Sequence, residues 1–108
     1  MNIELLSIIQ KYIDASNAHD VKSVLACFSD DAVVHDERET LRGTEAIRNW
    51  ITKTIEKYKF QFKPVGIKSD DAKPVVTVEV SGTFDGSPVT LDYQFTLENE
   101  KIRSLVID

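Results

Sequence analysis

The spacing of apolar residues changes from a helical period to a strand period near Lys59, and this change constrains the fold more than any other feature of the sequence. Before it, apolar side chains mostly recur every three or four residues, as they do on the buried face of an amphipathic helix. After it, they recur at every second residue, which is typical of strands with one buried face. Helices followed by consecutive strands predict an α+β domain, with the helices packed on one face of the sheet.

Three helices are predicted in the first half. The first covers about residues 3–17, where Tyr12 lies on the apolar face. The second begins after Asp20, a residue type that caps helix N-termini, and continues to Phe28. The third begins at Gly43-Thr44, with Thr44 as its cap and a glutamate in its first turn.

Strands are predicted where apolar and polar residues alternate or where β-branched residues gather. These segments are residues 32–36, 76–81, 91–97 and 102–107. Turn-forming residues at 29–31 precede the first of them, and further turn sequences occur at 70–71, 85–87 and 98–100. Because the connections in the second half are short, consecutive strands there should pair as antiparallel hairpins.

Length and charge exclude several classes of function. The chain has 108 residues, which we interpret as a single domain, residues 1–108, with one core and no separate cofactor-binding half. Its 13 basic and 18 acidic residues give a net charge of −5, which disfavours a nucleic-acid or membrane-surface partner. The glycines form no phosphate-binding motif, so no cofactor is predicted.

The cellular location is inferred from the first twenty residues and from cysteine use. Charged residues interrupt the apolar stretch of that segment, which argues against a signal peptide or membrane span. The single cysteine, Cys27, cannot form an internal disulfide and fits a reducing compartment. We therefore expect a soluble, cytoplasmic protein.

Two short motifs carry a resemblance to a known family. They are FSDDAVV at residues 28–34 and RGTEAI at residues 42–47, preceded by IQKY at 9–12 and NAHD at 17–20. This half of the chain resembles a nuclear transport factor 2-like domain of the SnoaL-like or ketosteroid-isomerase-like type. The resemblance implies a cone, in which a curved antiparallel sheet of the cystatin-like kind wraps around three N-terminal helices. It also implies an apolar pocket in the cone and a homodimer formed through the convex sheet face.

The resemblance places three candidate catalytic residues in the pocket. The isomerases of this family use an aspartate base and hydrogen-bond donors to an enolate oxygen. The base matches Asp36, and the first donor matches Tyr12. The second donor, an acid in the isomerases, matches Tyr93, which could donate in its place or serve as an aromatic wall. Tyr12 itself could equally be a core tyrosine, and Asp36 a solvated carboxylate at a strand end.

Further residues are candidates for ligand contact. The resemblance implies aromatic pocket positions at Phe28 and Trp50, which Tyr58 extends, and the inward strand faces add Val34 and Phe95. Aromatic residues at such spacing are also common in plain cores.

Arg38 would share the face of Asp36 if the strand continued past residue 36. A guanidinium there could stabilise the carboxylate or anchor an anionic ligand, whereas in a loop it would be only an exposed charge.

The sequence does not predict a metal site. His35, Glu37 and Glu39 alternate on one strand face, but a metal site normally draws ligands from several elements and needs a second shell of hydrogen bonds.

Two functions remain open from the sequence. The first is a cofactor-independent isomerase or cyclase that removes a proton next to the carbonyl of a small apolar molecule. The second is a non-catalytic ligand-binding or dimerisation module on the same fold, favoured by the missing second acid. A protein-binding adaptor would need an exposed apolar patch, and the sequence reveals none.

Overall fold

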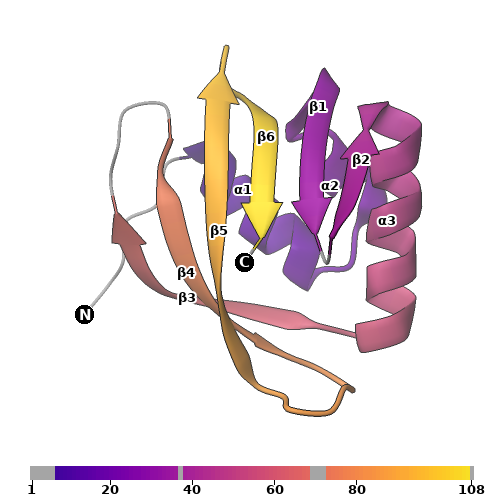
Figure 1. Cartoon of the computed structure of the whole chain (residues 1–108), viewed down its shortest axis with the longest axis vertical. Helices are drawn as coiled ribbons and strands as arrows, with labels where there is room; N and C mark the ends of the chain where they lie inside the picture. Colours follow the sequence, from indigo (N-terminus) through magenta and orange to yellow (C-terminus); the bar gives the residue numbers. More distant parts are fainter. Residues whose placement is uncertain (1–6, 37, 69–72, 108) are drawn as a thin grey trace.

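The computed structural model describes residues 7–36, 38–68 and 73–107, which form three helices and six strands (Figure 1). The helices are α1 (Ser7–Asn17), α2 (Val21–Leu25) and α3 (Gly43–Tyr58). The strands are β1 (Phe28–Asp36), β2 (Glu39–Arg42), β3 (Gln61–Lys68), β4 (Val75–Ser81), β5 (Val89–Glu98) and β6 (Lys101–Ile107). The predicted α+β class is confirmed.

The six strands form one sheet in the order β2-β1-β6-β5-β4-β3. Strands β3 to β6 pair as consecutive antiparallel hairpins, as the short turns predict. β1 pairs with β2 in an antiparallel ladder and with β6 in a parallel one. The last strand of the sequence therefore lies next to the first and joins the two halves of the chain.

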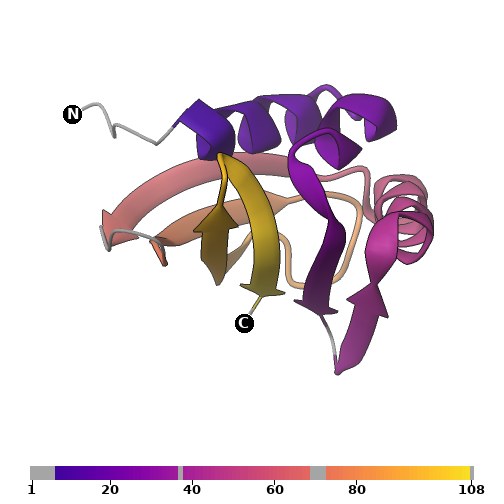
Figure 2. The ribbon, with the colours of Figure 1, turned by 90° about the horizontal axis from the view of Figure 1, so that it is seen from above.

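The sheet is curved and does not close, because β2 and β3 each have a neighbour on one side only. Part of the curvature arises at a bulge in β3, where Pro64 pairs with Val78 and Gly66 pairs with Thr77, so that Val65 has no partner residue. A proline cannot donate to a ladder, and β3 tolerates one because it is an edge strand. Figure 2 shows α1 and α2 on one side of the curved sheet.

The core lies between this side of the sheet and the helices. The alternating valines Val76, Val78 and Val80 of β4 are buried, as their period of two predicts. α1 contributes a buried face that includes Tyr12 and Ile13. Burial of each such aliphatic side chain stabilises the fold by about 1.5–3 kcal/mol.

Two predicted boundaries in the first half are wrong. The second helix ends at Leu25, and residues 28–31 belong to β1, because Phe28 already pairs with Ile102 of β6. Asp30 and Asp31 lie in an irregular stretch of this pairing, where they are exposed, so strand pairing overrides their preference for turns.

The second and third helices begin near the predicted positions, but only one of the two predicted N-cap residues forms a cap. Asp20 caps α2, since its carboxylate accepts a 3.2 Å hydrogen bond from the backbone N–H of Ser23. The predicted cap of the third helix, Thr44, is wrong: α3 begins at Gly43, and Arg42, two residues before Thr44, occupies the cap position without a side-chain bond. Residues 3–6 of the predicted first helix and the predicted turn at 70–71 lie outside the described residues.

A side-chain clamp fixes β3 to the end of α1. The Asn17 amide accepts a 2.6 Å hydrogen bond from the backbone N–H of Phe62 and donates a 3.0 Å bond to the carbonyl of the same residue. Nearby, Nε2 of His19 lies 2.7 Å from the carbonyl oxygen of Phe60. The clamp therefore holds the edge strand against the helix that carries Tyr12. Across the described ranges, no helix has the length and apolarity needed to cross a membrane.

Candidate functional site

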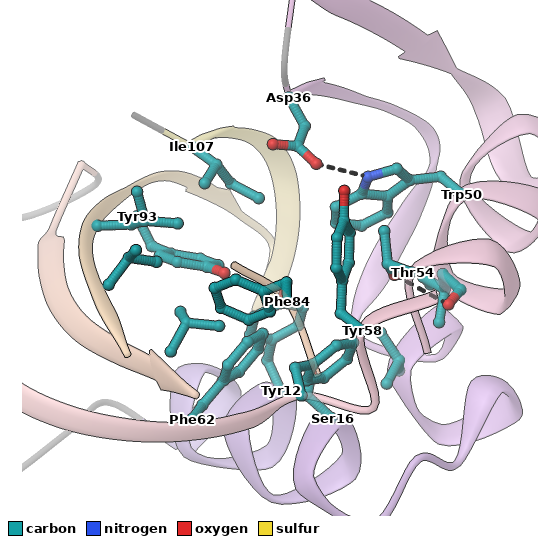
Figure 3. A pocket seen from close by; sticks show the side chains of 16 residues that line it. Tyr12, Ser16, Asp36, Trp50, Thr54, Tyr58, Phe62, Phe84, Tyr93 and Ile107 are labelled. Atoms are coloured by element: carbon teal, nitrogen blue, oxygen red, sulfur yellow. Dashed lines mark hydrogen bonds between the residues drawn. The ribbon is translucent and has the colours of Figure 1, made fainter. Parts of the chain in front are cut away.

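A cavity of about 140 Å³ lies between α1, α3 and the curved sheet (Figure 3). Most of its wall is apolar, with aromatic and aliphatic side chains from α3, the second-half strands and the β4–β5 loop. Seven of the lining residues have polar atoms in their side chains: Tyr12, Ser16, Asp36, Trp50, Thr54, Tyr58 and Tyr93. The pattern is that of a small-molecule site, an apolar hollow with a few converging polar groups.

Asp36 is held at the wall by Trp50. The indole N–H of Trp50 donates a 2.8 Å hydrogen bond to Oδ2 of Asp36. Asp36 is the last residue of β1 and Trp50 lies within α3, so the bond crosses from the sheet to the helix. A carboxylate held in this way keeps one orientation relative to the cavity.

Tyr12 and Tyr93 face the same cavity from α1 and β5 and are almost fully buried. Their ring centroids are 6.4 Å apart. Burial is the main cause that raises the pKa of Tyr12, with the negative charge of Asp36 as the second cause and a hydrogen bond with Ser16 acting in the opposite direction. Burial also raises the pKa of Tyr93 well above its usual value, and interactions with Tyr12 and Asp36 add to this. Both phenols therefore keep their protons at neutral pH and can donate hydrogen bonds.

Tyr58 and Phe84 form an aromatic pair at another part of the wall. Their ring centroids lie 5.5 Å apart, with an edge-to-face angle of 85°. In Figure 3, the hydroxyl of Tyr58 points toward the carboxylate of Asp36. Tyr58 thus adds a polar tip to the wall in addition to the aromatic ring that the sequence predicts.

A second hollow of about 360 Å³ lies between β2 and α3 and shares Asp36, Trp50 and Tyr58 with the cavity. Its other lining residues include the charged side chains of Lys53 and Lys57. The three shared residues therefore stand between an apolar inner space and a charged outer groove.

Five of the nine predicted site residues line the cavity, namely Tyr12, Asp36, Trp50, Tyr58 and Tyr93. Phe28 and Phe95 lie behind the wall and pack on the ring of Tyr12. Their ring centroids are 5.9 and 5.7 Å from the Tyr12 centroid, respectively. Val34 is fully buried in the core and, like these two rings, is not one of the described lining residues. These three side chains support the wall instead of forming it.

Of the two alternatives for Arg38, the structure shows the exposed loop charge and not a continued strand beside Asp36. The chain turns between β1 and β2, and Arg38 lies in this turn with a positive φ of 69° and an exposed side chain. A hairpin reverses the chain direction here, so a two-residue step from Asp36 no longer leads to the same face.

The same turn separates two of the residues considered for a metal site. His35 in β1 pairs with Thr40 in β2, and its Nδ1 lies 3.1 Å from that hydroxyl, whereas Glu39 pairs with Asp36. Glu37 lies outside the described residues. Within 7–36, 38–68 and 73–107, no three His, Cys, Asp or Glu side chains gather as a metal-binding group would.

Several cavity residues are missing from the predicted site. Ser16 is a buried polar residue on the apolar face of α1, and its spacing could have identified it as a pocket residue. Phe84 belongs to the loop after β4, where no periodic pattern indicates which way a side chain points. Thr54 lies one turn after Trp50 on α3, and the helical period does place it on that face.

Comparison with known proteins agrees with this architecture. The sequence pattern of the SnoaL-like domain matches residues 9–105. A proposed polyketide cyclase from Sinorhizobium meliloti is similar at 36% identity, with 96% of this chain and 95% of that chain covered and a TM-score of 0.93.

More distant structures share the fold. A Catenulispora acidiphila protein with a ketosteroid isomerase-like fold, solved in complex with trimethylamine, has a TM-score of 0.85 at 15% identity, with 97% of this chain and 86% of that chain covered. A cystatin-fold protein from Novosphingobium aromaticivorans has a TM-score of 0.83 at 18% identity, with 99% of each chain covered. The match over residues 9–105 and the 36% identity place this chain in the SnoaL-like domain family.

Proposed function

We propose that this protein binds a small apolar carbonyl compound in the cavity and catalyses an isomerisation or cyclisation that begins with removal of a proton next to the carbonyl. The observation that carries the proposal is the convergence of one carboxylate and two buried, protonated phenols on one mainly apolar space. Bases and donors arranged in this way are what enolate chemistry requires.

In the proposed reaction, the Asp36 carboxylate takes a proton from the carbon beside the carbonyl. The electron pair of the broken C–H bond forms the C=C bond of an enolate, and the negative charge moves to the carbonyl oxygen. Tyr12 and Tyr93 donate hydrogen bonds to that oxygen, and their raised pKa values keep both hydroxyls protonated. Asp36 then returns the proton to a carbon of the product.

One relative supports this direction. The similar Sinorhizobium meliloti protein is a proposed polyketide cyclase, and cyclisation of a polyketide joins carbons activated by neighbouring carbonyls. Dimerisation through the convex sheet face and a cytoplasmic location stay predictions.

Deuterium exchange tests the proposal without knowledge of the natural substrate. Cyclohexanone has one ring and exchangeable protons beside its carbonyl, and its proton NMR signals disappear in D₂O as exchange proceeds. We expect the wild-type protein to accelerate this exchange above the buffer rate. Asp36→Asn should lower the acceleration by roughly 10²-fold or more while the amide oxygen still accepts the bond from Trp50.

The matched control for this variant is Asp92→Asn. Asp92 is an exposed carboxylate on β5 that accepts a hydrogen bond from Thr77 and does not line the cavity. Its loss should leave the exchange rate unchanged. An exchange rate equal to that in buffer, or one that Asp36→Asn does not alter, would show that the proposed chemistry is incorrect.

A non-catalytic binding module is the second candidate. The observation that favours it is that Asp36 is the sole carboxylate among the described lining residues, so the second acid of the isomerases has no counterpart in the cavity. Binding of cyclohexanone without any accelerated exchange would support this function over catalysis.

A further inference from the structure

We infer that the cavity selects a ligand with a single ring and that Phe84 sets this limit. The inference rests on the proposed carbonyl ligand and adds to it a size class and a residue that determines specificity. It follows from the volume of the cavity and from the way in which the β4–β5 loop is attached to α3.

The first step is the volume. The cavity measures about 140 Å³. An apolar protein cavity of about 150 Å³ holds a molecule such as benzene. A six-membered ring with one carbonyl group is of this size, whereas two fused rings exceed it. The space therefore fits one ring, and a larger ligand would have to extend across its border with the second hollow at Asp36, Trp50 and Tyr58.

The second step is the position of Phe84. Its ring lines the cavity and packs edge-to-face on the ring of Tyr58. Phe84 comes from the loop between β4 and β5, and in Figure 3 its ring lies among those of Tyr12, Tyr58 and Tyr93. Removal of this ring would enlarge the space that Tyr12, Asp36 and Tyr93 face.

The third step is that the loop has little freedom to move Phe84 away. The backbone N–H of Thr83 donates a 2.8 Å hydrogen bond to the carbonyl of Tyr58, and the N–H of Gly82 donates a 2.9 Å bond to the hydroxyl of Ser87. A Cβ at Gly82 would lie 2.3 Å from the Tyr58 carbonyl oxygen, so the loop backbone lies directly against the end of α3. Hydrogen bonds before and after Phe84 therefore hold the loop backbone, and the packing of the Tyr58 ring restrains the Phe84 ring.

The test compares two ketones with one and two rings, cyclohexanone and 1-tetralone, by ligand-observed NMR titration. We expect the wild-type protein to bind cyclohexanone and to bind 1-tetralone at least tenfold more weakly. Phe84→Ala should improve the affinity for 1-tetralone by roughly tenfold or more, since pocket shape commonly discriminates ligands by such factors. Val65→Ala, an exposed position on β3 away from the cavity, is the control and should change neither affinity.

Circular dichroism and thermal unfolding check that each variant folds. If Phe84→Ala does not fold, Phe84→Leu takes its place and should give a smaller gain for 1-tetralone, because the leucine side chain leaves part of the space open. Equal affinity of the wild-type protein for the two ketones would overturn the inference and leave the proposed function standing. A folded Phe84 variant whose affinity for 1-tetralone does not improve would likewise overturn the inference and leave the proposed function standing. Absence of binding of either ketone to any variant would overturn both.

Discussion

The indole N–H of Trp50 reaches across from α3 and donates a 2.8 Å hydrogen bond to the carboxylate of Asp36 at the end of β1. The two residues are 14 positions apart in the sequence and belong to different layers of the fold. This bond from α3 orients the carboxylate of Asp36, the proposed base. The hairpin turn that follows Asp36 is therefore not needed to orient this carboxylate. Trp50 is accordingly a positioning residue in the proposed function.

Trp50→Phe should separate positioning from binding. The phenyl ring retains an apolar wall but cannot donate a hydrogen bond, so Asp36 loses the bond that orients it from α3. We expect the deuterium exchange of bound cyclohexanone to fall about 10- to 100-fold, with the ketone's dissociation constant changed less than threefold (about 0.6 kcal/mol). Thr52→Val, which removes a hydroxyl bonded to the backbone of α3 away from the cavity, is the control. A parallel loss of binding and exchange would instead indicate a purely structural role.

The buried tyrosines predict a loss of stability in alkaline solution. A tyrosine whose pKa is raised on folding stabilises the native state below its unfolded pKa of about 10, and this stabilisation is lost as the pH rises above that value. The reason is that the unfolded chain releases the proton while the folded chain still holds it. Each such group lowers the free energy of unfolding by about 1.4 kcal/mol per pH unit in that range.

Urea unfolding between pH 8 and pH 11 would measure this effect. Tyr12→Phe should flatten the alkaline part of the curve relative to the wild type, because the phenylalanine has no proton to release. Tyr93→Phe should do the same. Identical slopes for the wild type and both variants would mean that neither phenol is protonated and buried in the native state.

The clamp at Asn17 should be required for the stability of the edge strand. Asn17→Ala removes both hydrogen bonds to the backbone of Phe62, and the freed backbone groups are partly buried. We expect a loss of about 1–3 kcal/mol in the free energy of unfolding, measured in urea. Gln10→Ala, which removes an exposed hydrogen bond to Asp14 on the same helix, should change it by less than about 0.5 kcal/mol. Similar small effects of both substitutions would contradict the clamp.

Two glycines should respond in opposite directions to alanine. A Cβ at Gly82 would come within 2.3 Å of a backbone oxygen, so Gly82→Ala should destabilise the protein by about 1–3 kcal/mol. At Gly66 the nearest atom would be 3.8 Å away, an ordinary contact, and the backbone there does not have a positive φ. Gly66→Ala should therefore stabilise by about 0.4–1 kcal/mol through the unfolded state. Thermal unfolding of both variants measures the two effects. A higher melting temperature for Gly82→Ala would refute the close approach of Gly82 to the Tyr58 carbonyl oxygen.

Local patterns predict a large part of this fold, because buried faces leave a period in the sequence. The apolar face of α1 and the alternating valines of β4 are both confirmed. Contacts between distant segments leave no such period. The parallel pairing of β1 with β6 is one example. This pairing is the reason that Asp30 and Asp31 belong to a strand and not to a turn.

The candidate site is predictable to the extent that it lies on regular elements. Tyr12 and Trp50 are placed by helical spacing and Tyr93 by strand alternation, and all three line the cavity. Phe84 is placed by a loop whose path depends on hydrogen bonds to the end of α3. Arg38 shows the opposite case: strand alternation would place it beside Asp36, but a turn that reverses the chain makes it the exposed loop charge of the alternative prediction.

The parallel ladder between β1 and β6 also governs when this protein can fold. β6 lies between β1 and β5, so without it the sheet consists of two separate parts, one of two strands and one of three. During synthesis, β1 and β2 emerge early but have no partner on the inner side of β1 until residues up to Ile107 have been made. In a nascent chain the inner edge of β1 therefore stays unpaired until β6 has been made, and protection of this edge by chaperones matters most during that interval.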